Sequence, residues 1–62
     1  RPQLCFRDLN PSDKFEFLSL HLNTGKNLPL VKLEGYNNDY FRDQKEHIYS
    51  ASSIKEEKVK LI

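Results

Sequence analysis

The pattern of apolar positions along the chain predicts two helices, one strand and an ambiguous tail. Between residues 38 and 62 the apolar side chains converge on one face of a helical wheel, within an arc of roughly 160°. Charged residues occupy most of the opposite face. A stripe of this width has to be buried, so it indicates part of a core or of an interface. Its members are Tyr40, Phe41, Ile48, Ala51, Ile54, Val59, Leu61 and Ile62.

A first helix is predicted at 11–24. Asn10 followed by Pro11 is typical of a helix start, and Gly25 is typical of the residue just after a helix end. The same segment also allows a strand, which would form a hairpin around Thr24-Gly25. We favour the helix, because leucine is a better helix former than strand former.

The rest of the chain gives three more elements. A strand is predicted at 28–34, because Pro29 excludes a helix interior and apolar residues then alternate with charged ones. An amphipathic helix is predicted at 38–50, where the apolar stripe is most regular. Serines between residues 50 and 53 weaken the helical pattern. The tail, 54–62, is therefore either a helix or a strand.

These elements predict a small, helix-dominated α+β domain, with a β-rich domain built on the Thr24-Gly25 hairpin as the alternative. A chain of 62 residues makes one domain, 1–62, and buries only about 60% of the surface it exposes when unfolded. The first residue is Arg1 rather than Met. We therefore expect a domain excised from a longer protein.

The charge balance argues against a nucleic-acid-binding surface. Ten Lys and Arg residues stand against nine Asp and Glu, and the two signs are interleaved along the chain. Nucleic-acid binding usually needs a basic surplus gathered on one face. A nucleic-acid-binding domain is nonetheless kept as an alternative. It would use Arg42, Lys45, Lys55, Lys58 and Lys60.

Cysteine content and hydropathy indicate the compartment. Cys5 is the single cysteine, so the chain cannot form an internal disulfide. No apolar run approaches the roughly 18 residues of a membrane-spanning helix. We therefore expect an intracellular protein, cytoplasmic or nuclear, that does not enter the membrane.

The sequence contains no pattern of residues typical of catalysis. Asp43 and His47 have the spacing of neighbours on a helix and could share an ion, but a metal site needs three or four ligands. Cys5 stands at no spacing that would pair it with a histidine as a nucleophile. We expect no enzyme activity, no metal and no cofactor.

The function that remains is a non-catalytic protein–protein interaction or assembly module of a larger intracellular protein. Its partner would be another protein or the remainder of its own chain. Tyr49 is a candidate contact because it leaves the apolar stripe, and Ile54, Leu61 and Ile62 are candidates because they lie far from the predicted body. A further alternative is a structural fragment of an enzyme whose active site lies elsewhere.

Overall fold

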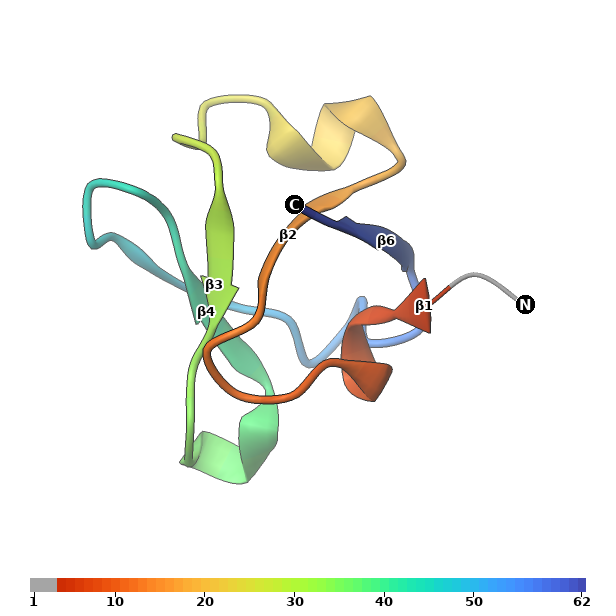
Figure 1. The fold of residues 1–62 in the computed structure, drawn as a ribbon, viewed down its shortest axis with the longest axis vertical. Helices are drawn as coiled ribbons and strands as arrows, with labels where there is room; N and C mark the ends of the chain where they lie inside the picture. Colours follow the sequence, from red (N-terminus) through yellow and green to blue (C-terminus); the bar gives the residue numbers. More distant parts are fainter. Residues whose placement is uncertain (1–3) are drawn as a thin grey trace.

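The structure is a computed structural model that describes residues 4–62. This part of the chain forms one antiparallel sheet with the strand order β1-β6-β2-β3-β4-β5, and its helical turns are short 3-10 helices (Figure 1). The strands are β1 (Leu4–Cys5), β2 (Lys14–Phe17), β3 (Leu30–Lys32), β4 (Tyr40–Arg42), β5 (Ile48–Ser50) and β6 (Lys58–Leu61). The 3-10 helices are η1 (Phe6–Asp8), η2 (Leu20–Asn23) and η3 (Tyr36–Asn38).

The prediction of a helix-dominated α+β domain is wrong, because the described fold is mostly β. In place of the helix predicted at 11–24 the chain forms β2 and then η2. Phe15 and Phe17 stand two apart on β2, so both rings point into the core, where both are fully buried. A helix would place them on different faces. Burial of both rings therefore overrides the helix preference of the neighbouring leucines.

The predicted helix start is a β-turn. The N–H of Asp13 donates to the C=O of Asn10 at 3.1 Å, and the Asp13 carboxylate accepts the N–H of Asn10 at 2.9 Å. Ser12 has a φ of 78°, which after Pro11 fits a type II turn. Asn, Pro, Ser and Asp favour turns as well as helix starts, so their order alone could not separate the two.

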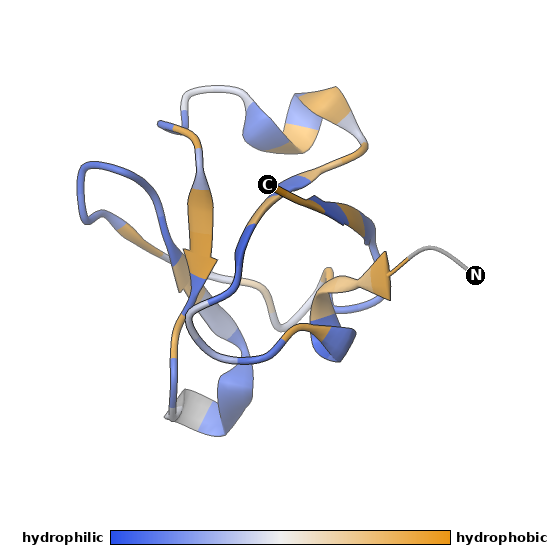
Figure 2. Ribbon diagram, in the orientation of Figure 1, coloured by the Kyte–Doolittle hydropathy of each residue, from blue (hydrophilic) through white to orange (hydrophobic). Residues whose placement is uncertain are grey.

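The amphipathic helix predicted at 38–50 is also wrong, since this segment forms β4, β5 and the turn between them. Phe41 and Tyr49 lie opposite each other across the hairpin, with stacked rings whose centroids are 5.4 Å apart. Figure 2 shows the turn that joins the two strands in hydrophilic colours. In the tail, residues Lys58–Leu61 form β6, which corresponds to the strand alternative for 54–62.

β3 lies within the strand predicted at 28–34, and it pairs antiparallel with β2. The β-rich alternative is therefore closer to the structure, but β2 and β3 are not joined by a tight turn at Thr24-Gly25, because η2 lies between them. The side chain of Asn23 ends the ladder. Its Oδ1 accepts the N–H of Phe17 at 3.1 Å and its Nδ2 donates to the C=O of Phe17 at 2.8 Å.

Four phenylalanine rings form the centre of the core. Phe6 comes from η1, Phe15 and Phe17 from β2, and Phe41 from β4. Every pair among them has ring centroids between 5.4 and 6.4 Å apart. All four are at most 1% exposed. The other buried members of this core are Leu9, Leu30, Ala51 and Val59.

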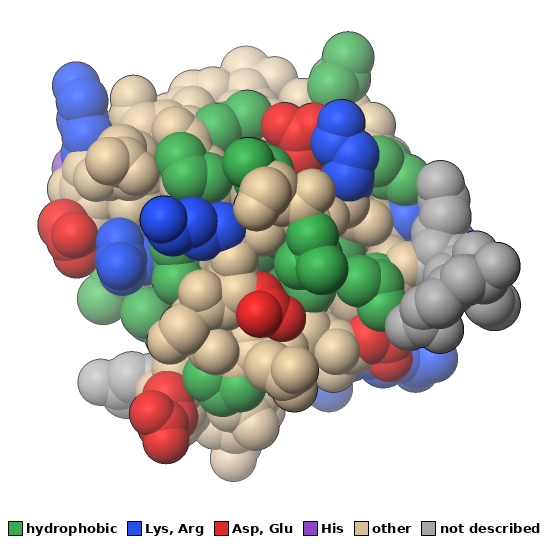
Figure 3. Space-filling model, in the orientation of Figure 1, with side chains coloured by type: hydrophobic (Ala, Val, Ile, Leu, Met, Phe, Trp, Pro, Cys, Tyr) green, Lys and Arg blue, Asp and Glu red, His purple; other side chains and the backbone are tan. Residues whose placement is uncertain are grey.

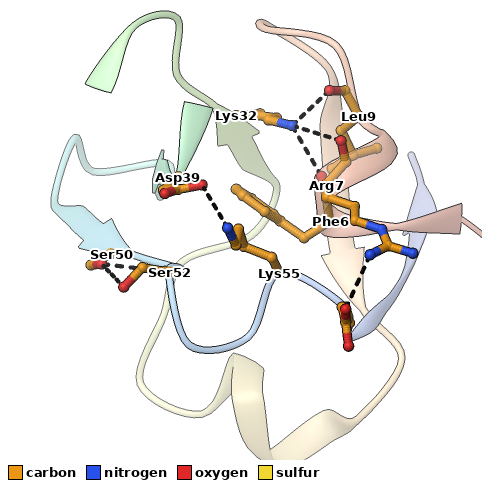
Figure 4. Close-up of polar contacts among 9 residues, drawn as sticks. Phe6, Arg7, Leu9, Lys32, Asp39, Ser50, Ser52 and Lys55 are labelled. Carbon is orange, nitrogen blue, oxygen red and sulfur yellow. Dashed lines mark hydrogen bonds and ion pairs between the residues drawn. The ribbon is translucent and has the colours of Figure 1, made fainter. Parts of the chain in front are cut away.

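Lys32 attaches the first helical turn to the sheet. Its side chain is buried, and Nζ donates to the carbonyl oxygens of Leu9 at 2.7 Å, Phe6 at 3.1 Å and Arg7 at 3.4 Å (Figure 4). The ammonium also lies 4.9 Å from the centroid of the Phe6 ring. Burial lowers the pKa of Lys32, and three carboxylates, led by that of Asp39, oppose this shift. The ammonium thus provides donors for the carbonyl groups of Arg7 and Leu9, and a second donor for the Phe6 carbonyl, which already accepts the N–H of Leu9 at 3.1 Å.

Replacing Ser12 by Gly should raise the free energy of unfolding by about 0.5–1 kcal/mol, because only Gly adopts a positive φ without steric cost. Chemical denaturation measures the difference. Ser53→Gly is the matched control, since Ser53 is an exposed serine without a positive φ. The turn assignment would be contradicted if Ser12→Gly were no more stable than Ser53→Gly.

Replacing Lys32 by Met should lower the free energy of unfolding by about 1–3 kcal/mol, because three carbonyl groups lose their common donor. Lys45→Met, at an exposed position, should stay within about 0.5 kcal/mol of the wild type. Guanidinium unfolding curves of the three proteins provide the comparison. Equal losses in both variants would show that the Lys32 ammonium does not support η1.

Candidate functional site

β5 is the last strand in the sheet order and pairs only with β4. Two backbone hydrogen bonds flank it on the side of β4. The N–H of Asp43 donates to the C=O of His47 at 3.0 Å, and the N–H of Ala51 donates to the C=O of Asp39 at 2.6 Å. In an antiparallel ladder, pairs that exchange hydrogen bonds alternate with pairs that do not. These two bonds therefore fix which backbone groups of β5 face β4.

By this alternation Tyr49 directs its N–H and C=O toward β4, while Ile48 and Ser50 direct theirs away from the sheet. Within residues 4–62, these outward N–H and C=O groups make no hydrogen bond to another backbone group. The side chain of Ile48 is 61% exposed beside them. The Ser50 hydroxyl is oriented locally, since it accepts the N–H of Ser52 at 3.4 Å (Figure 4). β5 is thus an open sheet edge.

The opposite edge of the sheet is protected. In the β1–β6 pair the N–H of Phe6 donates to the C=O of Glu57 at 3.0 Å, so the backbone of Cys5 faces away from β6. The N–H of Cys5 is bound by the Asp8 carboxylate at 3.1 Å. Covering an edge N–H in this way hinders pairing with another strand. Among the described strands, β5 is therefore the edge that is better placed to accept one.

A line of side chains leads from the β5 edge across the outer face of the sheet. Ile48 is in register with Arg42, Arg42 with Val31, and Val31 with Lys14. The N–H of Ile62, the residue after β6, donates to the C=O of Lys14 at 3.0 Å and continues the line. We call these five residues the outer row. Its two ends are exposed isoleucines. On the face of the molecule drawn in Figure 3, hydrophobic and charged side chains are intermixed.

The Asp43 carboxylate holds the hairpin that presents this edge. Asp43 is fully buried, and its Oδ1 accepts the N–H groups of Lys45 and His47, both at 2.9 Å. Its Oδ2 accepts the Tyr49 hydroxyl at 3.0 Å and the Asn27 side-chain amide at 3.3 Å. A single side chain therefore joins the turn, the edge strand and the loop before β3.

The shifted pKa values of Asp43 and Tyr49 keep the carboxylate ionised and the hydroxyl protonated, so the hydrogen bond between them persists. Burial raises the pKa of the Asp43 carboxyl, but its hydrogen-bond donors, led by the N–H of His47, outweigh burial and hold that pKa well below its ordinary value. Burial and the bond to Asp43 raise the pKa of the Tyr49 hydroxyl, so it remains a donor. Lys26 lies over the Tyr49 ring, with Nζ 4.8 Å from the ring centroid. The edge strand is held in place from its inner side.

The structure separates the four partner-binding residues that the sequence suggested. Tyr49 and Ile54 are partly buried and pack against the core. Leu61 is 50% exposed and Ile62 is 63% exposed at the end of β6. Of these four side chains, only those of Leu61 and Ile62 are largely exposed, and Ile62 stands at the far end of the outer row.

The basic residues of the nucleic-acid alternative are spread over the molecule and mostly paired with acids. Lys58 lies at 3.7 Å from the Cys5 sulfur, and Lys45 is exposed on the β4–β5 turn. The ion pairs are Arg42 with Glu46 at 3.3 Å, Lys55 with Asp39 at 4.0 Å and Lys60 with Glu16 at 3.3 Å. These contacts leave little basic charge gathered for a phosphate backbone.

The sequence does not reveal the edge, because the apolar stripe over 38–50 predicts a helix there. The available signal was the polar run Asp43-Gln44-Lys45-Glu46 between Phe41 and Tyr49, which is the pattern of a hairpin turn between two short strands. In residues 4–62 no group of three or more His, Cys, Asp or Glu side chains could hold a metal ion. No helix in that part of the chain is long and apolar enough to cross a membrane.

Asp43→Asn should lower the midpoint of thermal unfolding at pH 7, because an amide offers one acceptor oxygen where the carboxylate offers two. The folded pKa of Asp43 lies below the unfolded one, so the carboxylate stabilises the fold above about pH 4. That contribution is lost as the pH falls through the folded pKa. Between about pH 4 and pH 2 the wild type should therefore lose stability more steeply than Asp43→Asn.

Thermal unfolding followed across this pH range tests both parts. Glu34→Gln is the control, because Glu34 is an exposed carboxylate outside the hairpin. It should keep the pH profile of the wild type. Parallel acid profiles for the wild type and Asp43→Asn would contradict the role given to this carboxylate.

Comparisons with known proteins identify no function for this site, so its role is inferred from its geometry. No protein-family model matches this chain, and no curated protein and no solved structure matches it.

Proposed function

We propose that this chain is a non-catalytic protein-binding module whose β5 edge pairs with an extended segment of a partner polypeptide. One observation carries the proposal: the N–H and C=O groups of Ile48 and Ser50 face outward without a neighbouring strand. Adding a strand to an open edge is a recurring mode of peptide recognition. Backbone groups supply hydrogen bonds, and side chains next to them supply specificity.

The composition of the edge supports this assignment. Sheet edges in soluble proteins are commonly protected by lysine, proline, a bulge or an inward-pointing charge. β5 reads Ile48-Tyr49-Ser50 and carries none of these residues. Its length of three residues limits pairing to two outward-facing positions, Ile48 and Ser50, so binding depends on how well a partner strand aligns with both.

The outer row gives the edge an apolar neighbourhood. Ile48 stands at the edge, and Val31 lies two strands away with only 9% of its surface exposed. Between them the Arg42 guanidinium is held by Glu46. A partner strand beside β5 would cover Ile48 on this face. Ile62, at the far end of the outer row, would contact a partner that is large enough to extend across this face.

A photoreactive phenylalanine analogue at position 48 tests the proposal in an extract of cells that make this protein. Irradiation should give covalent adducts with a partner polypeptide, which mass spectrometry then identifies. The same analogue at Leu20, which is 77% exposed on η2, is the control and should give far fewer.

A second change makes the test specific for backbone pairing. Ser50→Pro removes an outward N–H but no hydrogen bond to β4, and proline is tolerated on edge strands. Adding it should abolish the adducts from position 48. Equal yields at positions 48 and 20, or adducts that survive the proline, would show that the edge is not the binding site.

We expect nucleic acid to bind only as a weak polyelectrolyte ligand, because ion pairs already engage Arg42, Lys55 and Lys60. Fluorescence anisotropy with a short DNA duplex and a single-stranded RNA measures this. Submicromolar affinity with a steep dependence on salt would instead favour the nucleic-acid alternative.

A further inference from the structure

We infer that the strand which pairs with the β5 edge is β5 of a second copy of this chain, so that two sheets join into one across a two-fold axis. The inference rests on the proposed function, because it names the occupant of the same edge. It follows from the self-complementarity of the edge in hydrogen bonds, charge and side chains.

In a pair of β5 edges, every outward N–H and C=O group finds a hydrogen-bond partner on the second copy. If the axis passes beside Tyr49, Ile48 lies opposite Ser50 of the partner subunit and Ser50 lies opposite Ile48 of the partner subunit. Each copy offers two N–H and two C=O groups that face outward, so this register satisfies all of them in four hydrogen bonds. A shift by one residue would place the outward groups of Ile48 opposite Tyr49 of the partner subunit, whose N–H and C=O groups face its own β4.

Charges beside the edge do not oppose this register. Continued beyond the strand, it places Lys45 opposite Ser53 of the partner subunit and Glu46 opposite Ser52 of the partner subunit. Like charges directly across a ladder destabilise pairing, and none meet here. The net charge of +1 per copy adds little repulsion at longer range.

The side chains of the edge also suit a copy of themselves. The two Tyr49 residues would stand directly opposite each other on the inner face, and aromatic pairs across strands are favourable. The two Ile48 side chains would lie on the outer face of the new ladder, each opposite Ser50 of the partner subunit and diagonal to the other isoleucine. Each isoleucine, 61% exposed in the single chain, would lose water contact there.

Preorganisation favours a second copy over a disordered peptide. Both would meet the same four outward groups. A disordered peptide loses conformational entropy when it becomes a strand. In a second copy β5 is already extended, because Asp43 and the stacked Phe41 ring hold Tyr49 in place. The smaller ordering cost selects the folded partner.

The dimer should be weak and strongly dependent on concentration. An edge of three residues covers far less than the roughly 1,000 Å² of a stable interface. Sedimentation equilibrium of the purified chain should therefore show a mainly monomeric protein at micromolar concentration. The weight-average mass should rise toward the dimer near about 1 mM, where a complex with a dissociation constant of that order is substantially formed.

Variants test whether the edge carries this association. Ser50→Pro should stay monomeric up to the highest concentration while its circular dichroism matches that of the wild type. If the proline variant unfolds, Ile48→Lys replaces it, because two lysines would then face each other diagonally across the ladder. Leu20→Ser, which removes an even more exposed aliphatic side chain from η2, should associate like the wild type.

Amide hydrogen exchange adds a reading at single residues. The N–H groups of Ile48 and Ser50 should exchange quickly in dilute protein and become protected at high concentration. The N–H of Tyr49, which faces β4, should be protected at both. Protection that does not change with concentration would overturn the inference.

Two further results would also overturn it: a wild type that remains monomeric near 1 mM, or a dimer that survives both edge variants. The cross-linking experiment separates the two proposals. Adducts from position 48 to a different polypeptide, lost with Ser50→Pro, would support the proposed function and refute the second copy. Adducts only between copies of this chain, obtained with the purified chain at about 1 mM where the dimer forms, would support both.

Discussion

The mutual contact of four phenylalanine rings is the interaction on which the rest of this structure depends. Each ring touches the other three, and they come from η1, β2 and β4. Aromatic pairs at these separations add about 0.5–1.5 kcal/mol each beyond their buried area, which matters in a chain with so small a core. To bring Phe6 to this centre the chain has to return over the sheet. Lys32 then holds η1 in place, because its ammonium donates to the backbone carbonyl groups of Phe6 and Leu9.

The same centre connects the core to the candidate site. Phe41 belongs to the cluster and stacks on Tyr49, whose hydroxyl donates to Asp43. Asp43 in turn fixes the turn from which β5 emerges. The position of the open edge is therefore set by buried groups on its inner side, while its outward face has no structural task among the described residues. The contacts that stabilise β5 and the groups proposed for recognition therefore lie on opposite sides of one short strand.

The sequence predicted local features better than their arrangement. Pro29 correctly excluded a helix around β3, and the alternation in the last residues allowed the strand that forms there. The helix at 11–24 failed because Asn10-Pro11-Ser12-Asp13 suits a turn as well as a cap, and only the burial of Phe15 and Phe17 decides between them. The open edge could not be predicted, because it depends on which strand has no neighbour, and that is a property of the whole sheet.

The position of β6 has a consequence for the order in which the chain can fold during synthesis. β6 lies inside the sheet, between β1 and β2, although it is the last strand in the sequence. Its register joins Phe15 to Leu61 and Leu4 to Val59, so the first and last strands of the described chain pair with each other. Contacts between residues so distant in sequence form slowly. A nascent chain would therefore keep Phe15 and Phe17 incompletely covered until residue 61 has left the ribosome, and chaperones would find their apolar surface in that interval.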